Sequence, residues 1–455
     1  MSYQLTALSP LDGRYSEKVS DLRPYFSEFA LIRYRVLVEI RWFLHLAEST
    51  DLPDGPKISM VDRTYLLKMI SVFSVEDAQA IKNIEATTNH DVKAVEYWIR
   101  DRFEESESLK KWVGFIHFAC TSEDINNLSY ALMLSDARTH VLSPCLQTII
   151  QVLNDLATYC ASMSMLSRTH GQPASPTTMG KEIKNFSHRL LIQKDILENI
   201  LIYGKINGAV GNYNAHQWVY PEIAWPNIAC DFVKSLGLTF NSHTTQIEPH
   251  DNIARYFDAL KGCNQIIQDL NQDMWGYISL NYFSQKVNAN EVGSSTMPHK
   301  VNPIDFENSE GNLSISTAIC EMMSRKLPIS RWQRDLSDST VLRNLGVAAG
   351  HSVLAFRSTL KGLGKLKANP DLMVREVAQA WEVLAEPIQM VMRRYGIANP
   401  YEQLKALSRG QRVNEEILHD FIKKSELPEN EKQRLLGLTP DQYIGNAVAL
   451  AKVEM

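Results

Sequence analysis

The stretch from Asp251 to Tyr282 reads DNIARYFDALKGCNQIIQDLNQDMWGYISLNY and contains no proline. It has few helix breakers besides Gly262 and Gly276. Its apolar residues recur at steps of mostly three and four, which places them along one face of an α-helix. These residues are Ile253, Phe257, Leu260, Ile266, Ile267, Leu270, Met274 and Ile278. The predicted helix is longer than most helices of globular proteins, which favours a fold built from long packed helices.

The spacing of prolines elsewhere allows further long helices, because proline cannot continue a helix or a sheet ladder. Proline is absent from residues 57–143, 177–220 and 250–297. The segment Lys181–Ile202 repeats the helical spacing of apolar residues, with polar residues between them. A further helix is predicted after Pro144, with Ser143 as its cap and Pro144 as its first residue.

Alternating strand patterns are short and rare, and the succession of strand, helix and strand expected of a doubly wound sheet is missing. We therefore predict a mainly α fold. The length of 455 residues suggests about three folded units. Prolines at 370, 387 and 400, together with a basic, loop-like stretch from Leu404 to Arg412, predict a smaller helical unit after about residue 365.

Composition places the chain among ordinary globular proteins. Hydrophobic residues make up 44% and charged residues 22% of the sequence, and the formal net charge is -5. The chain therefore has no global basic field for a nucleic-acid backbone, which disfavours DNA or RNA binding, although a local basic pocket for a small anion remains open.

The six cysteines are scattered, without a C-x-x-C pair or the dense spacing of a small secreted protein. The first residues, MSYQLTALSP, lack the basic and apolar segments of a signal peptide. No uncharged apolar run reaches about 18 residues. We expect a cytoplasmic protein with reduced thiols and no membrane span.

Five polar stretches interrupt the helical pattern and are dense in functional groups. They are Thr87–Asp91, Cys120–Asn127, Ser167–Ala174, Gly293–Pro303 and Arg331–Arg343. In the third stretch, Gly171 and Pro173 force the backbone out of a helix beside His170.

Each stretch taken alone also has a structural explanation. Thr121 and Ser122 belong to a cluster typical of a helix N-cap, and a lone histidine such as His90 or His170 is usually hydrogen-bonded for structural reasons. The Gly-Ser-Ser stretch could be a surface loop, and Arg331–Arg343 a solvated helix face.

Other chemistries fit the sequence less well. It contains no H-E-x-x-H, and its histidines and cysteines lack zinc-ligand spacing. The glycine-rich stretch Gly204–Gly211 lacks the Lys-Ser or Lys-Thr of a P-loop and follows a predicted helix, so we interpret it as a turn. There is no G-x-S-x-G elbow around Ser294.

The fourth stretch, GSSTMPHKVNP at 293–303, resembles the signature loop of the fumarase, aspartase and argininosuccinate lyase superfamily. Eleven residues with fixed glycine, serine, methionine, proline, lysine and asparagine positions match by chance far less often than a three-glycine motif. The chain is therefore identified as a member of this superfamily.

Further stretches resemble the adenylosuccinate lyase branch. SRTHGQPA from Ser167 has Gly171 after Thr-His, where the fumarase and argininosuccinate lyase branches usually carry leucine. The sequences DGRY from Asp12, TTNHD from Thr87, TSED from Thr121, TTQIEPH from Thr244, RWQRD from Arg331 and STVLRN from Ser339 are also similar to that branch. The resemblance extends from about residue 10 to the carboxyl-terminal helices.

The resemblance implies a three-domain, mainly α-helical subunit whose central helices associate into a homotetramer, with each active site built from three chains. Here the domains are predicted at residues 1–118, 119–365 and 366–455, the second carrying the long bundle and the signature loop. Helices with long apolar faces agree with this, because they need partners on more than one side.

The implied reaction is a β-elimination that releases fumarate from a succinylated nucleotide. A base must remove a proton from a carbon beside a carboxylate, and an acid must protonate the departing nitrogen. The match to the signature loop implies Ser294 as the base, activated by loop closure and by Lys300. His170 is implied as the acid, since imidazole titrates near neutrality.

The remaining implied site residues bind substrate, and no metal or organic cofactor is required. His90 is expected to orient the substrate. Carboxylate contacts are expected from Thr121, Ser122, Ser295, Lys300 and Asn302, and phosphate contacts from Arg14, Tyr15, Arg334, Ser339 and Arg343. Further contacts are expected from Asn89, Asp91, Gln246, Asn308, Thr340, Val341 and Leu342.

Two alternatives remain open from the sequence. A sister enzyme such as an argininosuccinate lyase is disfavoured by the context of Gly171. A catalytically silent helical scaffold is disfavoured because both Ser294 and His170 are present.

Overall fold

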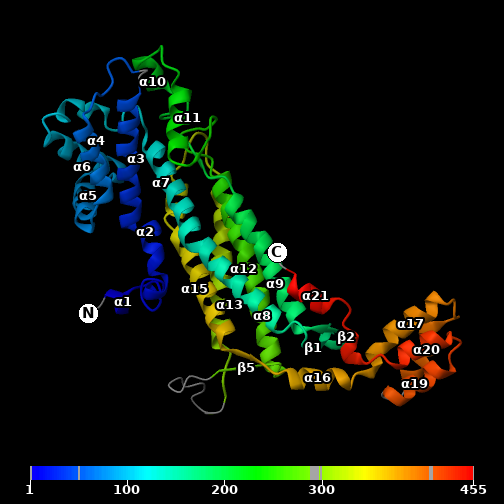
Figure 1. The fold of residues 1–455 in the computed structure, drawn as a ribbon. Coiled ribbons are helices and arrows are strands. Elements are labelled where there is room, and N and C mark those ends of the chain that lie inside the picture. Colours follow the sequence, from blue (N-terminus) through cyan, green and yellow to red (C-terminus); the bar gives the residue numbers. More distant parts are fainter. Residues whose placement is uncertain (1–2, 50–51, 287–296, 298–299, 409–412, 454–455) are drawn as a thin grey trace. The chain divides into compact units, whose positions relative to one another are not determined.

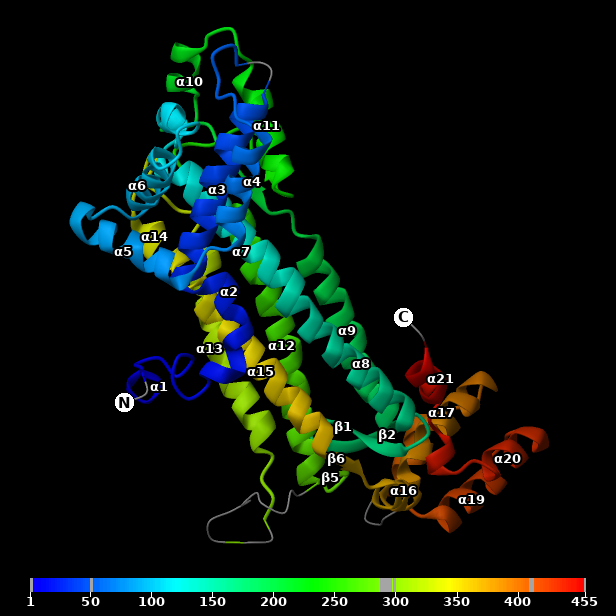
Figure 2. The same cartoon turned by 60° about the vertical axis from the view of Figure 1, so that its left-hand side comes forward.

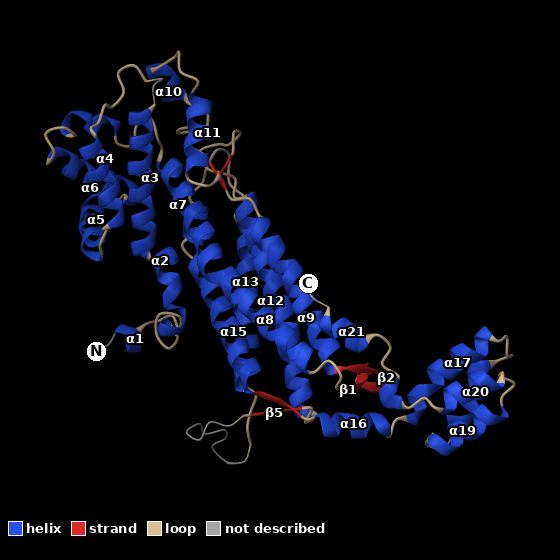
Figure 3. Ribbon diagram, in the orientation of Figure 1, coloured by secondary structure: helices blue, strands red, loops and turns tan. Residues whose placement is uncertain are grey.

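The structure is a computed structural model that describes residues 3–49, 52–286, 297, 300–408 and 413–453. It is mainly helical, as predicted, and its strands are short (Figure 3). The strands form three two-stranded pairs. They are the antiparallel pair β1 (Ser164–Thr169) and β2 (Gln172–Thr178), the parallel pair β3 (Tyr203–Gly204) and β4 (Thr239–Phe240), and the antiparallel pair β5 (Phe283–Gln285) and β6 (Leu366–Ala368).

The chain divides into two compact units, neither of which is a continuous segment. Unit 1 comprises Met1–Cys145, Gln193–Gln265 and Gly311–Ala355, and unit 2 comprises Leu146–Ile192, Ile266–Glu310 and Phe356–Met455. Five helices contribute residues to both units. They are α8 (Ser143–Tyr159), α9 (Met179–Asn199), α12 (Asp251–Ser279), α13 (Ile304–Lys326) and α15 (Leu345–Lys365), labelled in Figure 1. The predicted division into three domains stays a prediction.

The long helices confirm the periodicity of the sequence, because α12 and α9 coincide closely with the two longest predicted helices. The expected cap at Ser143 is wrong. Ser143 has helical angles of φ -62° and ψ -43°, and it follows a π-helical turn, η3 (Arg138–Leu142), directly after α7 (Ser122–Ala137). Proline has no N–H to donate to the backbone hydrogen bonds of a helix. The π-helical turn directly before Ser143 changes the hydrogen-bond pattern at the point where Pro144 would otherwise interrupt it.

Unit 1 has an amino-terminal core in which α3 (Glu28–Glu48) packs against α4 (Met60–Ser71), α5 (Val75–Thr88) and α6 (Asp91–Glu104). Phe43 and Phe103 pack edge to face there, with ring centroids 4.9 Å apart. On another side α3 packs against α7 (Figure 2). The other elements of unit 1 are α1 (Tyr3–Thr6), η1 (Ser16–Leu22), α2 (Arg23–Phe26), η2 (Lys110–Phe115), α10 (Asn214–Val219), α11 (Trp225–Ser235) and α14 (Ser337–Leu342).

Unit 2 carries the hairpin of β1 and β2 and the carboxyl-terminal helices. A separate apolar core lies among the latter, around Leu384, Ile388 and Met392. Residues 404–408, expected to be loop-like, are helical. The elements are α16 (Pro370–Ala378), η4 (Trp381–Leu384), α17 (Ala385–Arg394), α18 (Pro400–Ser408), α19 (Glu415–Lys424), α20 (Glu429–Leu436), η5 (Pro440–Gln442) and α21 (Ala447–Lys452).

Two buried polar triads join α12, α13 and α15. In unit 1, Asn264 donates from Nδ2 to Ser316 Oγ at 3.0 Å and accepts at Oδ1 from Ser352 Oγ at 3.0 Å. The two hydroxyls lie 2.7 Å apart. In unit 2 the same ring recurs with Asn271, Ser309 and Thr359, at 2.8, 2.8 and 3.0 Å. Each helix therefore contributes one residue to each triad, and these two residues are seven positions apart.

None of the helices that the structure describes is both long and apolar enough to cross a membrane.

Candidate active site

The predicted residues Asn89, His90 and Asp91 form the junction between α5 and α6. Asn89 caps α5 in the left-handed region, with φ 50° and ψ 34°, which asparagine tolerates better than most residues. His90 is the N-cap of α6 and accepts at Nδ1 from the backbone N–H of Lys93 at 3.1 Å. Nδ1 must then be unprotonated, so the neutral ring carries its hydrogen on Nε2. The structural explanation of His90, as a hydrogen-bonded residue, is confirmed. His90 is also exposed, and its Nε2–H is a hydrogen-bond donor.

Asp91 is held by two guanidinium groups. Arg35 on α3 lies 2.6 Å from its carboxylate and Arg343 lies 3.0 Å away. Burial by itself raises the pKa of Asp91, but the charge of Arg35, helped by that of Arg343 and by the backbone N–H of Val92, lowers it overall. Asp91 is therefore a carboxylate, and it ties Arg343 to the start of α6.

Thr121 and Ser122 stand at the N-terminus of α7, which confirms the helix-start interpretation of their stretch. Asp124 fixes this end, accepting from the backbone N–H of Thr121 at 2.8 Å and from Lys205 Nζ at 2.8 Å. It also accepts from the N–H groups of Asn207 and Gly208. The stretch 204–211, predicted to be a turn, begins in β3 and turns only at 209–210, and its first residues brace α7 through Asp124. The first N–H groups of a helix favour anions, so this end suits a carboxylate.

Arg334 and Gln246 lie beside the start of α7. Arg334 makes a 2.9 Å ion pair with the buried side chain of Glu123 and lies 3.8 Å from Asp338. The backbone N–H of Gln246 donates to the carbonyl of Gln333 at 3.3 Å. Its side chain donates to the carbonyl of Ala209 at 2.9 Å. Three separate stretches of sequence therefore meet at the N-terminus of α7.

The predicted residues from Ser339 to Arg343 lie in α14 and at its C-cap. The side chain of Arg343 also pairs with Glu28, at 2.9 Å. The side chain of Leu342 is buried in the core, so it does not contact substrate, and any contact at this residue is made by its main chain. A cavity of about 450 Å³ in unit 1 is lined by both Arg343 and Asp12. The structure therefore brings the Asp-Gly-Arg-Tyr stretch, with Arg14 exposed and stacked over Tyr15 at 5.7 Å, near Arg343.

His170 lies in unit 2, at the tip of the hairpin of β1 and β2. Thr169 pairs with Gln172, so His170 and Gly171 form a two-residue loop, and their φ values are +54° and +75°. Two positive φ angles are the requirement of a type I′ turn, which matches the twist of a hairpin. His170 is exposed, and its ring makes no hydrogen bond to a described residue. The turn therefore places His170 at the exposed tip of the hairpin.

The stem of this hairpin is tied to the helices of unit 2. Arg168 lies 3.5 Å from Glu376 on α16, and Tyr282 donates to the same carboxylate at 2.5 Å. The hydroxyl of Ser175 donates to Glu386 on α17. These contacts fix the base of the loop that carries His170.

The signature stretch is described only in part. Ser294 and Ser295 lie outside the described residues. Lys300 and Asn302 precede α13, and the carbonyl of Val301 accepts from Gln285 Nε2 at 3.2 Å, which anchors this approach to β5. Asn308 lies on α13, half-buried. Lys300, Asn302 and Asn308 belong to unit 2, like His170.

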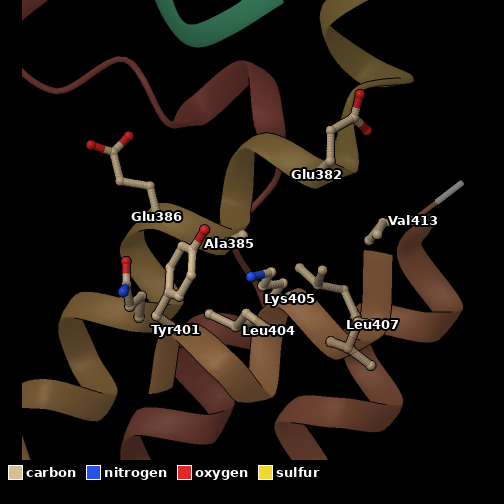
Figure 4. Close-up of a pocket in the computed structure, with 10 residues that line it drawn as sticks. Glu382, Ala385, Glu386, Tyr401, Leu404, Lys405, Leu407 and Val413 are labelled. Carbon is tan, nitrogen blue, oxygen red and sulfur yellow. The ribbon is translucent and has the colours of Figure 1, made fainter. Parts of the chain in front are cut away.

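A cavity of about 410 Å³ lies among the carboxyl-terminal helices of unit 2 (Figure 4). Its lining includes Glu386 from α17 and Tyr401, Leu404 and Lys405 from α18. None of the predicted site residues that the structure describes lines it, so this part of the candidate site does not coincide with the cavity.

Sequence reasoning missed the residues that hold the candidate site in place, above all Arg35 and Glu123. The sequence does not single out Arg35, because it lies inside a long apolar helix, where an arginine usually extends its head group to solvent. A signal was present, since Arg35 and Glu39 stand four residues apart within an otherwise apolar face of α3. Charged residues at such positions are buried only when they are paired.

Two family models match the chain. One, described as lyase, matches residues 13–316, and the other, described as adenylosuccinate lyase C-terminal, matches residues 330–444.

Among solved structures, the chain is similar to a 3-carboxy-cis,cis-muconate lactonizing enzyme from Pseudomonas putida, with a TM-score of 0.73, 18% identity and 95% of each chain covered. It is also similar to a fumarate lyase from Mesorhizobium sp. BNC1, with a TM-score of 0.73 and 16% identity over 95% of this chain and 96% of that one. At such identities the similarity shows the fold alone.

Curated relatives share far more of the sequence. An adenylosuccinate lyase from Haemophilus influenzae is 56% identical over 448 residues, which cover 98% of each protein. An adenylosuccinate lyase from Escherichia coli strain K12 is 55% identical over 446 residues, again 98% of each. By its match to the lyase model and by these relatives along nearly its whole length, the chain belongs to the adenylosuccinate lyase family.

Proposed function

We propose that the protein releases fumarate from adenylosuccinate, leaving AMP, and from the succinylated imidazole carboxamide nucleotide SAICAR, leaving AICAR. The observation that carries this proposal is the 56% identity to an adenylosuccinate lyase across 98% of both chains. The two substrates share a succinyl group and a ribose phosphate, so one set of anion contacts serves both.

The geometry of unit 1 supports nucleotide binding. Arg343 is partly exposed and lines a cavity together with Asp12, two residues before the exposed Arg14, and this arrangement suits a phosphate. Arg343 is already paired with Asp91 and Glu28, so a phosphate joins or replaces a carboxylate partner there. The N-terminus of α7 supplies N–H groups and the Ser122 hydroxyl for a succinyl carboxylate. The Nε2–H of His90 supplies a further donor.

The proton transfers are assigned to His170 and Ser294. Ser294, with its hydroxyl already deprotonated, takes the proton from the carbon beside the carboxylate, and the carbon–nitrogen bond breaks as the double bond of fumarate forms. His170, protonated at the start of the step, gives its proton to the departing nitrogen. No electron is gained or lost overall, so the step itself calls for no redox cofactor. The exposed position of His170 at the tip of a turn suits transfer to a bound molecule.

Assembly into a cytoplasmic homotetramer with shared sites is part of the proposal. Apolar side chains that one chain leaves uncovered on the long helices support it, for example Ile192 and Ile196 on α9, exposed by 51% and 48%. All six cysteines are free thiols, which suits a reducing compartment.

The test is an ultraviolet assay of purified enzyme with adenylosuccinate and SAICAR, with argininosuccinate and malate as controls. We expect turnover of both nucleotides, with fumarate as the common product. Turnover of argininosuccinate or malate but of neither nucleotide would show that the assignment is wrong.

A further inference from the structure

Arg35 is a buried cation that joins the two helix starts of the candidate site. It lies on α3 with only 2% of its side chain exposed. Its Nη2 lies 2.6 Å from Asp91 and its Nε donates to Asn126 Oδ1 at 2.8 Å. We propose that Arg35 is a positioning residue, which holds the start of α6 with His90 and the start of α7 with Thr121 and Ser122 in the arrangement that binds the nucleotide.

On the α6 side, the contact is one residue away from the predicted substrate donor. Asp91 is the first residue of α6, and His90 is its N-cap. Asp91 also binds Arg343 at 3.0 Å and accepts from the backbone N–H of Val92 at 2.9 Å. Loss of Arg35 would leave a half-buried carboxylate with one guanidinium instead of two, and the first turn of α6 would lose its direct ion pair with α3, keeping the indirect one through Arg343 and Glu28.

On the α7 side, the contact continues to a second predicted cation. Asn126 donates from Nδ2 to Glu123 Oε1 at 2.9 Å, and Arg334 pairs with the same oxygen at 2.9 Å. Glu123 is the second residue of α7, beside Ser122. Arg35 is therefore connected to Arg334 through Asn126 and Glu123, and to Arg343 through Asp91. One guanidinium thus links two of the three arginines predicted to bind the phosphate.

The geometry of the side chain explains why arginine is needed. Nε and Nη2 lie on one rigid plane and donate to acceptors on two different helices. A lysine has a single nitrogen on a flexible stem and cannot hold both acceptors in a fixed relation. Because Arg35 is almost fully buried, its effect on substrate must pass through the residues it holds. This inference rests on the proposed function for its kinetic readout, but its structural readout is independent of it.

The experiment compares Arg35→Met and Arg35→Lys with Arg138→Met in the full-length enzyme. Arg138 is a matched control, since it is half-buried in the same unit and donates to the carbonyls of Leu197 and Ile200, away from this network. The measurements are kcat and KM with adenylosuccinate, well below the unfolding temperature of each variant, and amide hydrogen exchange at 89–94 and 121–126, with α11 as reference.

We expect Arg35→Met to lower kcat/KM by about a hundredfold, the effect of misplacing binding groups by about an ångström. Hydrogen exchange should quicken at both helix starts but not in α11. Arg35→Lys keeps the charge and one contact, so its kcat/KM should fall between that of Arg35→Met and wild type. Arg138→Met should unfold at a lower temperature with kcat and KM near wild type.

Wild-type kinetics in folded Arg35→Met would overturn the proposal. So would a loss that Arg138→Met reproduces, or hydrogen exchange that quickens equally in α11, because either result would make Arg35 merely structural. If Arg35→Met does not fold, Arg35→Lys carries the same comparison. A wild-type enzyme inactive on the nucleotide would instead overturn the proposed function, and the exchange at the two helix starts would still decide whether Arg35 holds them.

Discussion

The backbone angle of Gly171 determines the turn that carries His170. A Cβ at this position would have no other atom of the described residues within 4 Å, so lack of space does not explain the glycine. The φ of +75° explains it. A β-branched side chain in the left-handed region costs about 1–2 kcal/mol, whereas asparagine tolerates it. We expect Gly171→Val to distort the turn and lower turnover strongly, because His170 is the other residue of the loop. Gly171→Asn, measured in the same assay, should stay near wild type, and equal losses in both would contradict this explanation.

The proposed proton-transfer groups make a second prediction at this scale. His170→Ala and Ser294→Ala should each lower kcat by at least about a hundredfold, the usual range for removing a general acid or base. Circular dichroism should show the helical content unchanged. His140→Ala is the control, since His140 is exposed and its ring stacks on Tyr25 at 6.2 Å in unit 1. Near-native turnover of either site variant would contradict the assigned role.

The burial of His216 predicts that the stability of the protein depends on pH. It is buried beside Trp225, and neither ring nitrogen has a partner among the described residues. Burial lowers its pKa to about 4. Between about pH 6.5 and pH 4 the unfolded chain therefore binds a proton that the folded chain does not, so stability falls as the pH falls. The loss amounts to about 3 kcal/mol below that window.

The measurement is urea unfolding at several pH values, for wild type and His216→Phe. Phenylalanine keeps the ring contacts and cannot take up a proton, so the variant should lose less stability between pH 6.5 and 4. Equal slopes in the two proteins would show that other groups cause the pH dependence.

Residue roles were only partly predictable from the sequence. His90 and Thr121 stand at helix starts, as their residue types and neighbours suggest, because capping is a local property. The link from Arg35 to Asp91 spans 56 residues, and no local pattern contains it. The hydrogen bond from Gln246 to Gln333 has the same cause, since it joins two loops that are distant in the sequence.

At the scale of elements, the two buried triads predict a non-additive response. Ser316→Ala leaves the Asn264 amide short of a partner in the core, which should lower the free energy of unfolding by about 1–3 kcal/mol. In the triple variant Asn264→Leu, Ser316→Ala and Ser352→Ala, no buried side-chain polar atom of the triad remains, so much of that loss should be recovered. Denaturant unfolding of the single and triple variants measures the difference, and strictly additive losses would contradict a closed ring.

The elements themselves were predictable to different degrees. α12 and α9 follow from apolar periodicity, since a helix that buries one face must repeat near every 3.6 residues. The hairpin of β1 and β2 was recognised only as a departure from helix at Gly171 and Pro173. β2 carries two prolines, and neither strand has an alternating pattern. Pairing and packing within unit 2 stabilise strands that the local sequence does not favour. The π turn before Ser143 has no signature that distinguishes it from a helix start.

For the whole molecule, the proposed tetramer predicts complementation between inactive chains. If His170 and Ser294 of one site come from different subunits, refolding His170→Ala together with Ser294→Ala should place both intact residues in about a quarter of the sites. Activity should return to that extent. Differently tagged chains must first be shown to form mixed tetramers. Mixed tetramers without activity would contradict the shared site.

The interleaving of the two units has a consequence for synthesis of the protein on the ribosome. Unit 1 needs Gly311–Ala355 in addition to Met1–Cys145. At about 5–20 residues per second, the ribosome reaches the third stretch on the order of ten seconds or more after finishing the first. During that interval α3 and α7 lack the later stretches that complete their unit. The apolar surface of α3 and α7 therefore stays partly uncovered on the nascent chain. We expect chaperones to bind this surface until Gly311–Ala355 has been synthesised.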